Sequence, residues 1–179
     1  MNAPAQENVV LVGFMGSGKS SVGRLVARTH QGHFVDTDRL VVDREGREIS
    51  DIFAAHGEPF FREQESAALR SLLGLTGLTR LVVATGGGIV TVPANVPLLK
   101  QLGLVVWLTA SEQVIWDRVS RNQKRPLLHT YNPRETVHSL LEIRNPLYEA
   151  VADLKVDTTD LTHAEVAAII CARLRNAEG

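Results

Sequence analysis

The sequence has little of what marks a secreted or membrane-anchored protein. Cys171 is the single cysteine among 179 residues, so no intramolecular disulfide can form and we expect a reducing compartment. The first apolar run, Val9–Val12, is far too short for a signal peptide or a membrane span, and no basic segment precedes it. We therefore expect a cytoplasmic protein without a membrane partner.

An excess of charge of one sign is also missing. Lys and Arg number 19 against 20 Asp and Glu, for a net charge of −1. The chain thus lacks the basic footprint of a nucleic-acid-binding protein and has room for a local basic patch at most. Hydrophobic residues make up 44% and charged residues 22%, as in ordinary globular proteins. At this length we expect one domain over residues 1–179.

Short β-branched runs alternate with longer helical stretches. The runs lack strict polar alternation, as expected for strands buried on both faces of a parallel sheet. The predicted strands are Val9–Val12, His33–Asp36, Leu81–Ala84, Leu104–Leu108 and Leu154–Asp157. The predicted helices are Lys19–Thr29, Ser50–Ala55, Pro59–Leu73, Ala94–Gln101, Glu112–Arg121, Arg134–Val151 and His163–Leu174. This alternation predicts an α/β fold with a doubly wound sheet.

One segment, residues 122–133, fits neither a strand nor a helix. It is long for a connection in a compact domain, and loops of that length are often functional lids or simply mobile. Its sequence alone leaves both interpretations open.

The most specific motif is a glycine-rich loop between the first predicted strand and the first predicted helix. Residues 13–20, GFMGSGKS, fit G-x-x-x-x-G-K-[ST] at every fixed position. Glycines let backbone N–H groups converge on phosphate oxygens, and the N-terminus of the following helix adds a favourable dipole. Lys19 would then reach the β- and γ-phosphates, and the Ser20 hydroxyl would ligate Mg²⁺. The sequence therefore predicts a nucleotide site.

The loop indicates the nucleotide but not the acceptor. A GTPase would need a guanine-reading N-K-x-D motif, and the nearest string, NQKR from Asn122, does not match it. The length also leaves little room for the insertions of a large ATPase.

Two carboxylates, Asp36 and Asp38, follow the second predicted strand. The carboxyl ends of parallel strands form the ligand edge of such sheets, and side chains two residues apart in an extended chain point the same way. Asp36 could hold Mg²⁺ through water, and Asp38 could accept a proton or a hydrogen bond from an acceptor hydroxyl. The alternative is a turn in which an aspartate caps a helix.

Three glycines, residues 86–88, end the third predicted strand. They would allow a ligand to approach the backbone closely, or they would form a tight turn into the next helix.

Together these motifs resemble the shikimate kinase family. In order, the motifs are GFMGSGKS at 13–20, DTD at 36–38, GEPFFREQE at 57–65, ATGGG at 84–88, RPLL at 125–128 and RNPLY at 144–148. The resemblance implies a three-layer P-loop kinase fold, with a five-stranded parallel sheet in the order 2-3-1-4-5 flanked by helices. It also implies a mobile lid at about 122–133 and a substrate-binding region at about 38–65. The implied reaction transfers the γ-phosphoryl group of ATP to the 3-hydroxyl of shikimate, in chorismate and aromatic amino-acid biosynthesis, by a monomer.

The resemblance implies roles in the nucleotide site. The ATP phosphates would be held by Gly16, Ser17, Gly18, Lys19, Ser20 and Ser21. Mg²⁺ would be held by Ser20, with Asp36 in its outer shell. Arg125 would reach the phosphates from the lid, and Arg118 would lie near the adenine.

For the acceptor, the resemblance implies that Arg62 and Arg144 bind the shikimate carboxylate, which a planar guanidinium meets bidentately. Asp38 would hydrogen-bond the shikimate hydroxyls and is the candidate base, and the backbone of Gly87 would contact the ring hydroxyls. Around them, the implied residues are Phe53 and Phe61, lining the pocket, and Glu65, orienting an arginine.

Other interpretations remain open at this point. Arg62 and Arg144 could pair with glutamates of their own helices at the surface, and Arg125 could be merely solvated. The chain could be a gluconate-kinase-like enzyme, against which the combination of DTD, FFRE and RNPLY speaks. It could also be a kinase-like ligand-binding module without turnover, but the implied catalytic residues Lys19, Asp38 and Arg125 are all present.

Overall fold

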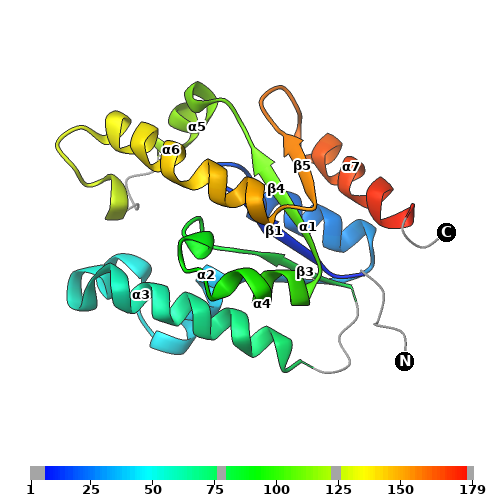
Figure 1. The fold of residues 1–179 in the computed structure, drawn as a ribbon, viewed down its shortest axis with the longest axis horizontal. Coiled ribbons are helices and arrows are strands. Elements are labelled where there is room, and N and C mark those ends of the chain that lie inside the picture. Colours follow the sequence, from blue (N-terminus) through cyan, green and yellow to red (C-terminus); the bar gives the residue numbers. More distant parts are fainter. Residues whose placement is uncertain (1–6, 76–79, 122–125, 177–179) are drawn as a thin grey trace.

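A computed structural model describes residues 7–75, 80–121 and 126–176. Five parallel strands form one sheet with helices on both faces (Figure 1). The strands are β1 Val9–Val12, β2 His33–Asp36, β3 Leu81–Ala84, β4 Leu104–Thr109 and β5 Leu154–Asp157. The helices are α1 Lys19–Thr29, α2 Thr37–Glu45, α3 Ile49–Leu73, α4 Asn95–Leu102, α5 Glu112–Val119, α6 Pro133–Val151 and α7 His163–Arg175, with short 3-10 helices η1 Ile89–Thr91 and η2 Pro126–Leu128.

The strand order is β2-β3-β1-β4-β5, and every neighbouring pair is parallel. Both the order and the α/β class are as the sequence and its resemblance predicted. All residues of β1 and β3 are buried, because layers cover both faces of the sheet there. The order places the loop after β1 at the middle of the carboxyl edge, between the loops that follow β3 and β4.

Two apolar clusters divide the core into the two faces of the sheet. Along β1, Val9 and Leu11 face the cluster with α1 and α7, while Val10 and Val12 face the cluster with α3, α4, α5 and α6. Figure 1 shows α1 and α7, in blue and red, beside each other. The result is the three-layer architecture. No helix in the described ranges is both long and apolar enough to cross a bilayer.

Helix α2 was not predicted, and it changes how the two aspartates lie. Asp36 is the N-cap of α2, since its side chain accepts a hydrogen bond from the backbone N–H of Asp38 at 3.0 Å. Gly46, at φ 64°, ends the helix in the left-handed conformation. Asp38 therefore stands in the first turn of a helix, so the expectation of two carboxylates on an extended segment is wrong.

The two helices predicted at 50–55 and 59–73 form the single element α3 with a kink. The kink is at Gly57, whose φ of 79° and ψ of 175° are not helical. Pro59 follows two residues later, in the first turn of the second segment. A backbone N–H at that position would have no carbonyl oxygen of the helix to bond, so proline is tolerated there. The kink separates the first segment from the part of α3 that carries Arg62 and Glu65.

The packing of α7 gives a test of the core. Ile170 is 0% exposed in the cluster with α1 and β4, while its neighbour Ile169 is 40% exposed. We expect Ile170→Ala to lower the free energy of unfolding by about 2–5 kcal/mol, because it leaves a cavity. The matched variant Ile169→Ala should lose less than about 1 kcal/mol. Urea denaturation measures both, and equal losses would contradict this packing.

Candidate active site

The glycine-rich loop between β1 and α1 encloses the side chain of Lys19. Lys19 is buried, and its Nζ donates hydrogen bonds to the carbonyl oxygens of Gly13 at 2.7 Å and Phe14 at 2.8 Å. Gly16 and Gly18 have φ values of 80° and 91°, in the left-handed region that side chains disfavour. The sequence thus produces a curled backbone, an ammonium group and a helix N-terminus at one place, which is an arrangement suited to phosphate.

Ser20 and Asp36 meet beside this loop. The Ser20 hydroxyl donates to Asp36 Oδ2 at 2.7 Å, and the other carboxylate oxygen of Asp36 is held by the α2 backbone. Mg²⁺ in nucleotide sites takes one or two oxygen ligands from the protein and completes its shell with phosphate oxygens and water. The Ser20–Asp36 pair therefore has the chemistry that a Mg²⁺ ion requires.

Arg118 and His163 line the cavity over the loop, and Thr158 is a hydrogen-bond partner of Arg118. Arg118 donates to the carbonyl oxygen of Gly16 at 3.2 Å, and to the hydroxyl and carbonyl oxygens of Thr158 at 3.4 Å each. His163, at the start of α7, lies 3.1 Å from where a Cβ on Gly18 would be and lines the same cavity. No motif marks Thr158 and His163, but both follow β5, which ends beside β4 at the carboxyl edge.

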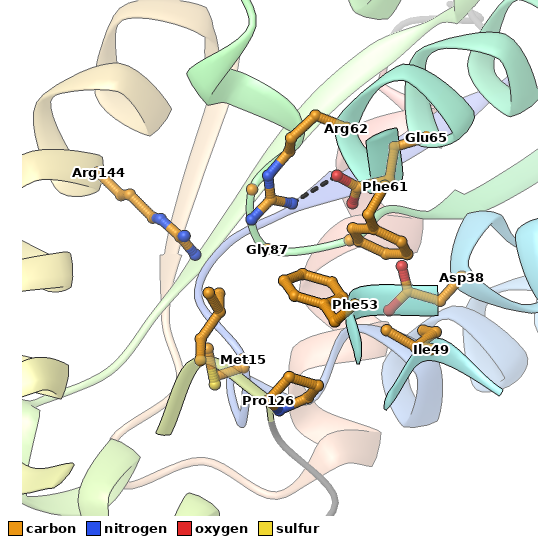
Figure 2. Close-up of a pocket in the computed structure, with 13 residues that line it drawn as sticks. Met15, Asp38, Ile49, Phe53, Phe61, Arg62, Glu65, Gly87, Pro126 and Arg144 are labelled. Carbon is orange, nitrogen blue, oxygen red and sulfur yellow. Dashed lines mark hydrogen bonds and ion pairs between the residues drawn. The ribbon is translucent and has the colours of Figure 1, made fainter. Parts of the chain in front are cut away.

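A second pocket adjoins this cavity (Figure 2). It is lined by Met15, Asp38, Ile49, Phe53, Phe61, Arg62, Glu65, Gly86, Gly87, Gly88, Pro126, Leu127 and Arg144. Met15, Asp38 and Gly87 line both the pocket and the cavity over the phosphate loop. Asp38 therefore stands between a site suited to phosphates and a pocket for a second, smaller molecule.

Arg62 and Arg144 reach into this pocket from opposite sides (Figure 2). The Arg62 side chain is only 11% exposed and pairs with Glu65 at 2.5 Å and Glu58 at 2.7 Å. Arg144 is 3% exposed, lies over the Phe14 ring at 5.7 Å, and forms no ion pair within the described ranges. The interpretation of these two arginines as surface residues is therefore wrong, although Arg62 does pair with Glu65 of its own helix, as that interpretation expected.

The two guanidinium groups differ in their electrostatic surroundings. Burial lowers the pKa of Arg144. Burial acts in the same direction on Arg62, but Glu65 and Glu58 raise the pKa of Arg62 above its ordinary value. The charge of Arg62 is thus balanced within the protein. A buried guanidinium without a carboxylate partner, as at Arg144, favours a ligand that brings an anionic group.

Glu65 and Asp38 lie close together behind the pocket. A Cβ on Gly86 would lie 1.9 Å from Glu65 Oε1 and 2.7 Å from Asp38 Oδ1, so the glycine leaves the space that the two carboxyl groups share. Glu65 is 1% exposed, and its Oε1 has no hydrogen-bond partner in the described part of the chain. Burial raises the pKa of Glu65 to about 7, with Asp38 adding to the effect and Arg62 opposing it.

Comparison with known proteins decides the family. A family model described as shikimate kinase matches residues 15–175. The chain belongs to the shikimate kinase family. A shikimate kinase from Geobacter sulfurreducens is 46% identical over 176 residues, which cover 98% of this chain and 95% of that protein. The structure of a shikimate kinase from Acinetobacter baumannii in complex with shikimate has a TM-score of 0.88 at 38% identity, covering 94% of this chain and 93% of that chain. The family resemblance and the P-loop kinase fold are confirmed.

A gluconokinase from Sinorhizobium meliloti also shares the fold. Its structure gives a TM-score of 0.60 at 21% identity and covers 98% of this chain and 96% of that chain. At that identity the likeness shows the fold alone. The shikimate kinase family is thus favoured over the gluconate-kinase-like alternative.

In this member of the shikimate kinase family, the expected lid is described from residue 126 onward. Pro126 and Leu127, in η2, line the same pocket as the three glycines at residues 86–88. Arg125, which the resemblance places against the phosphates, lies outside the described residues. Its role therefore stays a prediction, as does closure of the segment over ATP.

The raised pKa of Glu65 predicts how stability depends on pH. The folded chain holds a proton on Glu65 up to about pH 7, whereas an ordinary glutamate loses it near 4.5. Between these values the folded state binds more protons, so this group's contribution to the free energy of unfolding falls as pH rises, by on the order of 3 kcal/mol in full. Because glutamine does not titrate, the free energy of unfolding of Glu65→Gln should lack this pH-dependent contribution.

Urea denaturation of the wild type and of Glu65→Gln between pH 5 and pH 8 measures this pH-dependent contribution to the free energy of unfolding. The stability of the wild type relative to Glu65→Gln should decrease toward pH 7 and then level off. Glu63→Gln, at an exposed position of the same helix, is the matched control and should show no such trend. A difference between wild type and Glu65→Gln that does not change with pH would contradict the shifted pKa.

Proposed function

We propose that the protein transfers the γ-phosphoryl group of ATP to the 3-hydroxyl of shikimate, a step of aromatic amino-acid biosynthesis. The observation that carries the proposal is a pair of arginines, the buried Arg144 and the largely buried Arg62, facing one small pocket that meets the phosphate-loop cavity at Asp38. A ring with one carboxylate and several hydroxyls fits an anion clamp at one end and a carboxylate acceptor at the other. Family membership and the likeness to a shikimate-bound structure support the same acceptor.

On the donor side, the loop from Gly16 to Ser21 would bind the ATP phosphates. Lys19, now bonded to two loop carbonyls, would turn its ammonium group to the β- and γ-phosphates. Ser20 would ligate Mg²⁺, and Asp36 would hold it through water; the ion would neutralise charge on the phosphate oxygens. Arg118 would lie near the adenine, and Arg125 would contact the phosphates from the lid.

On the acceptor side, Arg62 and Arg144 would share the carboxylate. Asp38 would accept hydrogen bonds from the ring hydroxyls and take the proton of the attacking one, while the backbone of Gly87 would contact the ring. Phosphoryl transfer has a loose transition state, so the main contribution of these residues is to hold the hydroxyl in line with the γ-phosphate and to stabilise spreading negative charge.

We further propose a cytoplasmic monomer of one domain that acts on small molecules and binds neither nucleic acid nor membrane. The even balance of charge and the single cysteine support this.

The proposed reaction is tested by ADP release in a coupled assay with shikimate, quinate and gluconate as acceptors. We expect turnover with shikimate, and none above background with gluconate. Lys19→Ala should reduce turnover to below about a tenth of wild type, because such a charge stabilises the transition state by several kcal/mol, while shikimate binding survives. Lys155→Ala, at an exposed lysine, is the control and should keep full activity. Preference for gluconate, or the absence of any turnover, would reject the proposal.

Acceptor recognition should depend on both arginines. Replacing Arg62 or Arg144 with alanine should lower kcat/KM for shikimate about ten- to a hundredfold, since each charge-assisted bond contributes roughly 1.5–3 kcal/mol. ATP binding should change little. Removing the second arginine should have a smaller effect than removing the first, because both act on one group. Arginine-to-lysine variants should recover only part of the loss.

The control is a shikimate analogue with a neutral amide in place of the carboxylate. The wild type should discriminate strongly against the analogue, and the two alanine variants much less. Variants that discriminate as strongly as the wild type would show that the carboxylate binds elsewhere.

A further inference from the structure

Tyr148 is a buried polar residue that the proposed reaction leaves without a role. It is 0% exposed and lies on α6 one turn after Arg144. Its hydroxyl donates a hydrogen bond to the carbonyl oxygen of Gly87, 61 residues away in the loop after β3. The Arg144 guanidinium lies close to this hydroxyl and interacts with it electrostatically. One atom thus joins two groups of the acceptor pocket that come from different elements.

The surroundings of Tyr148 fix the position of this hydroxyl. Its ring packs against Trp107 of β4, with the ring centroids 5.9 Å apart, so the phenol is anchored on the central part of the sheet. Burial raises the pKa of the Tyr148 hydroxyl above its ordinary value, and the group therefore remains a donor throughout the neutral range. Arg144 in turn lies against the loop of three glycines at residues 86–88, since a Cβ on Gly87 would be 3.7 Å from Arg144 Nη1.

We propose that Tyr148 is a positioning residue for the acceptor, which ties the Arg144 guanidinium to the Gly87 backbone through its hydroxyl. This inference rests on the proposed function, in which Arg144 binds the carboxylate and Gly87 contacts the ring hydroxyls. The tie keeps the two ends of the acceptor site at a fixed separation. Without the hydroxyl, the buried carbonyl of Gly87 loses its hydrogen-bond partner, and the Arg144 guanidinium loses the polar neighbour that holds it beside the loop.

The variant Tyr148→Phe isolates the hydroxyl, because the ring that packs on Trp107 is retained. We expect kcat/KM for shikimate to fall about tenfold, mostly through a higher KM for shikimate, with KM for ATP within about twofold of wild type. Ser71, whose side chain is exposed near the end of α3 and outside the site, provides the control: Ser71→Ala also removes a single hydroxyl and should behave as wild type. A merely structural role would lower the unfolding temperature without favouring one substrate over the other.

A double-mutant cycle with Arg144→Ala tests whether Tyr148 acts through that arginine. We expect Tyr148→Phe to reduce kcat/KM for shikimate less in the Arg144→Ala background than in the wild type. An equal reduction in both backgrounds would overturn the inference, and so would a Tyr148→Phe variant within twofold of wild type. A wild type without activity on shikimate would instead reject the proposed function, and this inference with it.

A second measurement keeps the test open if Tyr148→Phe does not fold. In the Tyr131→Phe background, Tyr148 is the remaining tyrosine, so biosynthetic replacement of tyrosine by a fluorinated tyrosine alters that hydroxyl alone. Fluorination makes the phenol a stronger hydrogen-bond donor to the Gly87 carbonyl and a weaker acceptor toward Arg144. KM for shikimate should therefore change while KM for ATP stays within about twofold, and an unchanged KM for shikimate would count against the positioning role.

Discussion

The site depends on the parallel pairing of β1 with both β3 and β4. Because all three strands run the same way, their carboxyl ends deliver the phosphate loop, the triple-glycine loop and the start of α5 to one edge of the sheet. The pairing also holds β1 between two covered faces, so its four residues are buried and cannot shift register without exposing apolar side chains. The donor and acceptor sites are adjacent as a consequence of this order.

Charge burial shapes the acceptor pocket. Arg62 forms ion pairs with Glu65 and Glu58, whereas Arg144 forms no ion pair among the described residues and lies against the Tyr148 hydroxyl and the Phe14 ring. A buried positive charge without an ion pair, as at Arg144, is unfavourable in the protein without ligand, and binding of an anionic ligand compensates it. In the proposed function, the guanidinium without an ion pair would favour an acceptor that carries a carboxylate.

The triple-glycine loop is shaped by the charged side chains behind it. A Cβ at Gly86 would collide with Glu65, and a Cβ at Gly88 would lie 2.1 Å from the Arg62 guanidinium. The loop therefore passes directly over the Arg62–Glu65 ion pair, and the absence of side chains lets backbone and ion pair share the pocket wall. Of the two sequence interpretations of this stretch, the tight turn is confirmed, since Ile89–Thr91 forms a 3-10 turn directly afterwards. Close approach of a ligand stays a prediction.

The sequence by itself determined the strands, the sheet class, the phosphate loop and, through ordered motifs, the family. These features depend on local patterns: β-branched runs, glycine spacing and residue types at fixed offsets. Only the tertiary structure decided that Asp38 stands in the first turn of α2, that the Arg62–Glu65 ion pair is largely buried, that Thr158 bonds Arg118 and His163 lines the phosphate-loop cavity, and that Tyr148 bonds Gly87. Their roles arise from contacts between segments far apart in the chain, such as Tyr148 with Gly87. Burial and the loss of water that it brings are set by the packed layers and leave no mark in the local sequence.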